Sequence, residues 1–254
     1  MIIEFSVNDD STEHFMETYE GLVRKVYTSK TKPAVLLVHN VFYNNGGNAQ
    51  LMHGRIARHY DLPAVSMQST IYPEVVSGHI ENRDITPDDL HPNDAGHALV
   101  ASVITYFLDK VRTEDVKELS EPDYPAPLTK NTYEKSIRHQ NNDEKAVCFK
   151  HGWTASKKGD SITFDIEGCN VSVQYRKSVK LPAPVAEIIV DGETDHAVRL
   201  DANFDETWGD KLELDTILEH GENKVHKVEV RLVETHEDDA VPFYLVSVIG
   251  SSEK

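Results

Sequence analysis

Apolar and polar positions follow two different periods along the chain. In residues 1–115, short uninterrupted apolar runs alternate with stretches in which apolar residues recur every three or four positions. An uninterrupted run such as residues 34–38 is typical of a strand buried in a parallel sheet, and the longer period is typical of an amphipathic helix. The first half therefore predicts a βαβαβα succession, which folds as a parallel sheet covered by helices.

The expected strands of this half are three apolar runs, at residues 1–5, 34–38 and 63–67. Helices are expected after the capping residues Ser11 and Thr12, at residues 49–59, and after Asp94, because Ser, Thr and Asp accept hydrogen bonds from the first turn of a helix. Residues 68–93 are expected to form a long loop. The apolar side of the last helix is predicted to consist of Leu99, Val103, Ile104, Phe107, Leu108 and Val111.

The second half of the chain changes to a period of two. Short strands are expected at residues 146–150, 161–166, 169–175, 185–191, 197–201, 227–233 and 243–249. Turn signals that contain Gly159, Gly168 and Gly192 separate them. This pattern predicts an all-β sandwich of jelly-roll type.

A linker is expected between the two patterns. Prolines stand among polar residues at 119–132, and such a stretch favours neither a helix nor a strand. The expected domains are therefore residues 1–118 and residues 133–254.

The acidic charge narrows the classes of partner. The 254 residues include 43 acidic and 26 basic ones, for a formal net charge of −17. Nucleic acids and anionic membranes repel such a chain, so neither is an expected partner. No apolar run reaches the roughly 20 residues that span a bilayer, and residues 1–5 show no basic secretion signal. A cytoplasmic location is expected, with Cys148 and Cys169 as buried free thiols.

Asp88 and His91 form the strongest chemical signal in the sequence. An Asp three residues before a His, just ahead of a helix, can place its carboxylate on the imidazole. The carboxylate then fixes the tautomer and leaves the other ring nitrogen free as a general base. The same spacing is also found where an Asp and a His only staple a loop.

Asn8 follows the first expected strand, in the stretch Ser6-Val7-Asn8-Asp9. Sites in open parallel sheets lie beyond the carboxyl ends of the strands. An Asn amide at such a place can donate to a developing oxyanion, an interaction worth about 3–4 kcal/mol of the barrier. An Asn-Asp pair after a strand is equally typical of a turn or a helix cap.

Together and in this order, the two signals resemble the SGNH (GDSL-like) hydrolase superfamily. The Asn-Asp pair is similar to its third block, although Ser6 stands where Gly is usual, and the Asp-x-x-His spacing matches its fifth block. The resemblance covers residues 1 to about 112 and implies part of a flavodoxin-like, three-layer α/β/α fold. It implies His91 as the general base, Asp88 as its orienting partner and Asn8 as an oxyanion donor, with no cofactor. Asp88, His91 and His97 could also be metal ligands, but their spacing lacks the closed ligand set of zinc sites, so no metal is expected.

The resemblance also implies a serine nucleophile in a Gly-Asp-Ser motif ahead of the Asn block. The sequence has these letters at Gly159-Asp160-Ser161, where the context indicates a hairpin turn that opens a strand. Ser6 does not hold the nucleophile position of that fold. We therefore expect the nucleophile to be missing from this chain, and the outer strand to present an unpaired apolar edge that invites association.

Asn40 and Trp208 are candidate substrate-binding residues. Asn40 follows the second strand on the same edge as Asn8 and can hydrogen-bond to sugar hydroxyls, although Asn also simply makes turns. Trp208 can stack on a sugar ring or belong to the core of the β half. His39 and His53 could line the site, but their positions at a strand end and on a helix face favour a structural role.

Two functions remain open. The first is an SGNH-type serine ester hydrolase that removes acyl groups from carbohydrates, because residues 204–209 are similar to part of the β-sandwich appended to some carbohydrate-acetyl esterases of this superfamily. Its partners would be a small-molecule or oligosaccharide ester and, at the open edge, a second copy or a complementing N-terminal segment. The second is a non-catalytic carbohydrate-binding or interaction protein with a degenerate hydrolase half.

Overall fold

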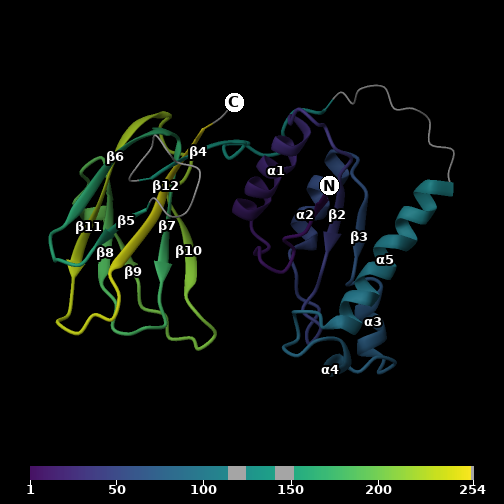
Figure 1. The fold of residues 1–254 in the computed structure, drawn as a ribbon. Helices are drawn as coiled ribbons and strands as arrows, with labels where there is room; N and C mark the ends of the chain where they lie inside the picture. Colours follow the sequence, from purple (N-terminus) through teal and green to yellow (C-terminus); the bar gives the residue numbers. More distant parts are fainter. Residues whose placement is uncertain (114–123, 141–151, 253–254) are drawn as a thin grey trace. The chain divides into compact units, whose positions relative to one another are not determined.

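The computed structural model describes residues 1–113, 124–140 and 152–252 (Figure 1). The chain forms two compact units, Met1–Asn131 and Thr132–Lys254. The strand predicted at residues 146–150, which contains Cys148, lies outside the described residues, as do residues 119–123 of the predicted linker. Among the described residues, no helix has the length and apolar character needed to cross a membrane.

The first unit is built on a short parallel sheet. Its strands are β1 (Ile2–Ile3), β2 (Leu36–His39) and β3 (Ala64–Ser66), and they lie in the order β1-β2-β3. The central strand β2 is buried along its whole length, as its uninterrupted apolar run predicts. The predicted parallel sheet is confirmed. Strands β1 and β3 are shorter than the predicted runs, and β2 begins two residues later and ends one residue later than predicted.

Helices cover both faces of this sheet (Figure 1). Helix α1 (Glu13–Tyr27) is capped by the preceding Thr12, whose hydroxyl accepts a hydrogen bond from the backbone N–H of Phe15. With α2 (Gln50–His59), α1 packs on the face that carries Leu37. Helix α5 (Asp94–Thr113) packs part of its apolar side on the opposite face, which carries Leu36 and Val38. The alternation of side chains along β2 thus divides the core into two layers.

Three expectations for this unit need correction. The predicted loop contains two short helices, α3 (Ile71–Val76) and α4 (Asn82–Ile85), because buried apolar residues anchor both of them. Helix α5 is capped by Asn93, whose side-chain oxygen accepts the N–H of Gly96, so Asp94 lies inside the first turn. The predicted apolar side of α5 is only partly covered, and its C-terminal members Leu108 and Val111 are 49% and 41% exposed.

Residues 124–131 belong to the first unit and are bound to α1 through the buried Glu20. Its carboxylate accepts hydrogen bonds from the Tyr60 hydroxyl at 2.5 Å and from the backbone N–H groups of Leu128 and Thr129 at 2.6 and 2.8 Å. Burial acts to raise the pKa of Glu20, but the hydrogen bonds from Thr129, Tyr60 and Leu128 outweigh it and lower the pKa. The ionised carboxylate therefore fastens this segment to α1.

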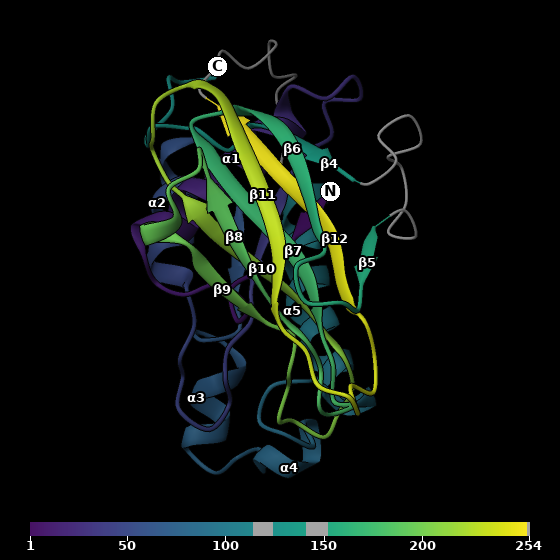
Figure 2. The same ribbon diagram turned by 90° about the vertical axis from the view of Figure 1, so that its left-hand side faces the viewer.

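The described residues of the second unit form antiparallel strands and a short 3-10 helix, η3 (Thr194–His196). The strands are β4 (Lys135–His139), β5 (Trp153–Ala155), β6 (Ser161–Gly168), β7 (Asn170–Lys177), β8 (Val185–Val190), β9 (Val198–Asp201), β10 (Lys211–Leu218), β11 (Lys224–Glu234) and β12 (Phe243–Ser252). One sheet has the order β10-β7-β12-β4 with β5 also paired to β12, and the other has the order β6-β11-β8-β9 (Figure 2).

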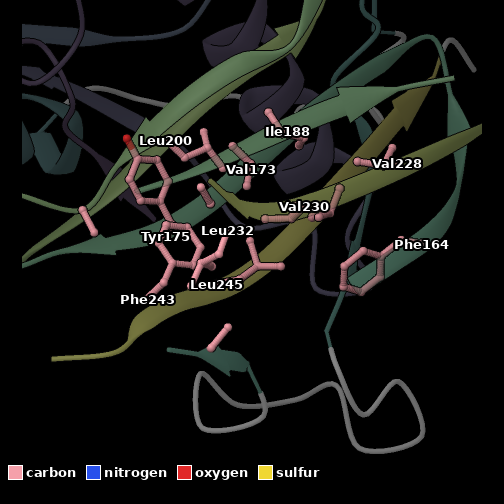
Figure 3. Close-up of a cluster of buried hydrophobic side chains, with 14 of the residues drawn as sticks. Phe164, Val173, Tyr175, Ile188, Leu200, Val228, Val230, Leu232, Phe243 and Leu245 are labelled. Atoms are coloured by element: carbon pink, nitrogen blue, oxygen red, sulfur yellow. The ribbon is translucent and has the colours of Figure 1, made fainter. Parts of the chain in front are cut away.

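The two sheets of this unit share one apolar core (Figure 3). Val173, Tyr175 and Phe243 from the first sheet and Ile188 and Val230 from the second are among its buried members. The sequence analysis missed β4, β5 and β10. Strand β10 lies at the edge of its sheet: Leu212 and Leu214 are 45% and 55% exposed, and Ile217 and Leu218 are only partly buried against the core.

Candidate active site

The loop ahead of α5 brings Asp88 and His91 together. The His91 Nδ1 atom lies 2.7 Å from Asp88 Oδ2. The other oxygen, Asp88 Oδ1, accepts the backbone N–H groups of His91 at 2.8 Å and Leu90 at 3.1 Å. The side-chain hydrogen bond from His91, followed by these two backbone hydrogen bonds, holds the pKa of Asp88 well below its ordinary value. Asp88 is therefore an ionised, oriented carboxylate at neutral pH.

This pair has the arrangement of a general base and its orienting acid. A carboxylate beside Nδ1 favours the tautomer that carries the proton there, which leaves Nε2 with a free lone pair. The His91 side chain is 76% exposed, so a substrate can reach Nε2 directly. The ionised Asp88 also stabilises the imidazolium that forms once Nε2 has taken a proton.

The neighbouring Asp89 ties the His91 loop to the loop that follows β2. Its backbone oxygen accepts the N–H of Tyr43 at 2.8 Å, and its carboxylate accepts the side-chain amide of Asn82 at 2.6 Å. Arg83 forms an ion pair with the same carboxylate at 2.9 Å. Asp89 has a positive φ of 73°, a left-handed conformation that Asp tolerates better than most residues. Sequence reasoning missed this anchor, although the doubled Asp was visible.

Asn8 lies in a turn that directly follows β1. The backbone N–H groups of Asn8 and Asp9 both donate to the Phe5 carbonyl oxygen at 3.0 Å, and the Asn8 residue is exposed. Ser6 at the start of the turn is fully buried. Its Oγ lies 2.7 Å from the Glu4 carboxylate and 3.0 Å from the Asn40 carbonyl oxygen, so it is a structural hydroxyl and not an exposed nucleophile.

Asn40 lies between the Asn8 turn and the loop that carries His91. It comes immediately after β2, and its side-chain oxygen accepts the Tyr43 hydroxyl at 3.2 Å. On one side its carbonyl oxygen is within hydrogen-bond distance of Ser6, and on the other side Tyr43 is bound to Asp89. The structure thereby connects the Asn8 turn, the Asn40 loop and the His91 loop at the carboxyl end of the sheet, where sites of parallel sheets lie.

The remaining predicted residues lie in the second unit. Trp208 is 67% exposed, and its ring packs edge-on against Phe204 with 5.1 Å between the centroids. Trp208 is thus a surface aromatic residue and not a core residue. Gly159-Asp160-Ser161 forms the predicted turn: Gly159 has a φ of 93°, and Ser161 opens β6, paired with Arg231 of β11.

His39 and His53 are buried, as a structural interpretation expects, with exposures of 2% and 0%. Burial lowers the pKa of His39 to about 4, and the nearby His53 adds to this effect. Neither ring nitrogen of His39 has a hydrogen-bond partner among the described residues. His53, in contrast, places Nε2 3.0 Å from the Asp9 carboxylate, next to Asn8.

Solved structures provide the comparison for this chain. No protein-family model matches it, and no curated protein does. A crystal structure of a two-domain esterase (CEX) active on acetylated mannans, co-crystallised with mannopentaose, is 86% identical in sequence and has a TM-score of 0.94. A second crystal structure of such an esterase has the same identity and a TM-score of 0.96. Each match covers 100% of this chain and 72% of the related chain.

Proposed function

This chain belongs to the same family as the two-domain esterase that acts on acetylated mannans, and we propose that it is part of a serine esterase that removes acetyl groups from mannan-type carbohydrates. The observation that carries this proposal is the Asp88–His91 pair, with its short hydrogen bond and exposed imidazole. A histidine base that a carboxylate orients suits acyl transfer through a serine, as the resemblance to SGNH hydrolases implies.

The roles follow from the chemistry of acyl transfer. A serine hydroxyl attacks the acetyl carbonyl carbon while His91 Nε2 takes its proton, and the imidazolium then gives that proton to the departing sugar oxygen. Water attacks the acetyl-enzyme with His91 again as the base, which releases acetate and restores the serine. Asp88 stabilises the imidazolium in both steps, and the exposed Asn8 amide donates to the oxyanion.

The serine comes, in this proposal, from a segment outside this sequence. Ser6 is buried and Ser161 opens a strand of the other unit. Just over a quarter of the related chains' length has no counterpart here, since the matches cover 72% of them. The surface that such a segment would cover is apolar: β1 is an edge strand with Ile2 56% exposed, and the outer side of α5 exposes Tyr106.

Two residues, one in each unit, are proposed as separate sugar contacts. Asn40 lies at the carboxyl end of β2. Its loop is hydrogen-bonded both to the Asn8 turn and to the His91 loop, and its side-chain amide is available for sugar hydroxyls. Trp208 offers an exposed indole ring, and aromatic faces stack on the C–H faces of sugar rings. The esterase co-crystallised with mannopentaose supports an oligosaccharide ligand for the family.

The test compares this chain alone with a completed enzyme. In the completed enzyme, this chain is fused to the segment of the related esterase that has no counterpart here. Acetate release from acetylated mannan is expected from the completed enzyme and not from the chain alone. His91→Ala should abolish the release, while His97→Ala, an exposed change in the same motif, should not.

Three outcomes would contradict the proposal. Turnover by the chain alone that His91→Ala abolishes would place a nucleophile inside this sequence. An inactive completed enzyme that still binds mannopentaose would favour a carbohydrate-binding protein. Dimers of the chain that the added segment does not dissociate, seen by light scattering, would assign the open edge to a second copy.

A further inference from the structure

His53 is the buried histidine that the proposed chemistry does not use. It lies on α2, is 0% exposed, and contacts the turn of Asn8 through a single polar contact. Its Nε2 is 3.0 Å from Asp9 Oδ2, and Asp9 directly follows Asn8 in the chain. A ring nitrogen this close to a carboxylate oxygen carries the proton and donates.

The His53 ring has little freedom to leave this position. The Tyr19 ring from α1 stacks on it with centroids 3.7 Å apart and planes 5° apart. Tyr19 is itself 2% exposed. The two helices on this face of the sheet thus clamp an imidazole whose donor nitrogen points at the residue next to Asn8.

The Asn8 turn is held to α2 at two places. The N–H of Ala49, ahead of the helix, donates to the Ser6 carbonyl oxygen, and His53, one turn into the helix, binds the Asp9 carboxylate. The Asp9 side chain is only 14% exposed, so it is largely withdrawn from water into this contact. The first contact fixes the start of the turn, and the second fixes the residue beside the oxyanion donor.

We infer that His53 is a positioning residue for the esterase reaction: through Asp9 it holds Asn8 in the orientation that donates to the oxyanion. This inference rests on the proposed function. An oxyanion donor contributes only when it points at the place where charge develops, and small displacements of reacting groups cost large factors in rate. Removing the His53 hydrogen bond should therefore lower kcat and leave KM nearly unchanged.

The experiment uses the completed enzyme and acetylated mannan. His53→Phe keeps the ring that stacks on Tyr19 and removes the donor, and we expect kcat to fall about 10-fold or more. His53→Gln, which can still donate to Asp9, should recover most of the loss. The matched control is His39→Phe, because His39 is a buried ring whose nitrogens have no partner among the described residues; its kcat should stay within about twofold of wild type.

A double-mutant cycle connects the effect to Asn8. If His53 acts through Asn8, His53→Phe should cost nothing further once Asn8→Ala is present. Asp9→Ala changes a turn residue outside the core, so it should reproduce the loss of kcat even if His53→Phe does not fold.

The outcomes separate this inference from the proposed function. Full additivity of His53→Phe and Asn8→Ala, or equal losses in His53→Phe and His39→Phe, would overturn the inference alone. If Asn8→Ala itself leaves kcat unchanged, the oxyanion role of Asn8 fails and the positioning role fails with it.

Discussion

The two units of this protein organise their apolar residues differently. In the second unit, two sheets face a shared core in which Val173, Ile188 and Val230 are fully buried. In the first unit, α5 runs for 20 residues and buries only Gly96, and β1 leaves Ile2 56% exposed. This partly covered helix α5 comes directly after the loop that carries the candidate catalytic pair.

Stability and catalysis are expected to depend on different parts of the protein. Both units gain stability from their own cores, because apolar area removed from water contributes about 25 cal/mol per Å². The first unit leaves apolar area on α5 and β1 in water, and such patches mark surfaces that another segment or protein covers. We expect changes in the second unit to act on stability or on sugar binding, and changes in the loops of the first unit to act on catalysis.

The largest expected effect is on catalysis and lies in the first unit. In the completed enzyme, Asp88→Asn should lower kcat by about 10³–10⁴-fold, because the carboxylate that fixes the His91 tautomer and stabilises its imidazolium is lost. Steady-state acetate release measures this. Asp94→Asn, an exposed change a few residues away, should leave kcat within a few-fold, and a similar loss from both variants would refute the assigned role of Asp88.

The next effect should be confined to the stability of the second unit. Phe243 is fully buried and stacks on Tyr175 with 5.9 Å between the ring centroids. Phe243→Ala should lower the free energy of unfolding of this unit by about 3–5 kcal/mol, through lost burial and the cavity that remains.

Differential scanning calorimetry can show whether the two units unfold separately. Phe243→Ala should shift one transition, and Leu37→Ala, in the core of the first unit, should shift the other. Equal shifts of both transitions in either variant would show that the units fold as one.

A smaller effect is expected where residues 124–131 join α1. Glu20→Gln keeps the size of the side chain but removes the charge that four donor groups of Thr129, Tyr60 and Leu128 share. Since hydrogen bonds to charged groups contribute about 1.5–3 kcal/mol each and partly survive in Gln, we expect a loss of about 2–4 kcal/mol. Urea unfolding at pH 7 measures it.

The pH dependence of this difference gives a sharper test. The folded-state pKa of Glu20 is lowered, so its ionised form contributes stability that is fully present above the unfolded-state pKa of about 4.3. The contribution is lost as the pH falls through the lowered folded-state pKa. Wild type and Glu20→Gln should therefore converge in acid, and a difference that stays constant down to the lowest accessible pH would contradict this assignment.

The smallest effect is expected at the exposed aromatic residue of the second unit. Trp208→Ala should weaken mannopentaose binding about 5- to 10-fold, which corresponds to about 1–1.4 kcal/mol, because one stacking face is lost. Isothermal titration calorimetry measures the change. Leu214→Ala removes another exposed apolar side chain and should leave the affinity unchanged; equal losses in the two variants would argue against stacking on Trp208.

Several features could be predicted from the sequence because neighbouring residues decide them. The uninterrupted run that forms β2 is buried on both faces, Thr12 caps α1, and Gly159 takes the positive φ of a turn. The Asp88–His91 contact belongs here too, because a spacing of three residues in a tight loop can bring the two side chains together.

Other features were decided only when distant segments packed. Strand β10 pairs with β7, and β4 pairs with β12. The apolar patterns of β10 and β4 themselves did not predict either strand. The hydrogen bond between His53 and Asp9 joins residues 44 positions apart. The sequence indicated only that His53 lies on a helix face and favoured a structural role, because its partner depends on where another segment of the chain comes to lie.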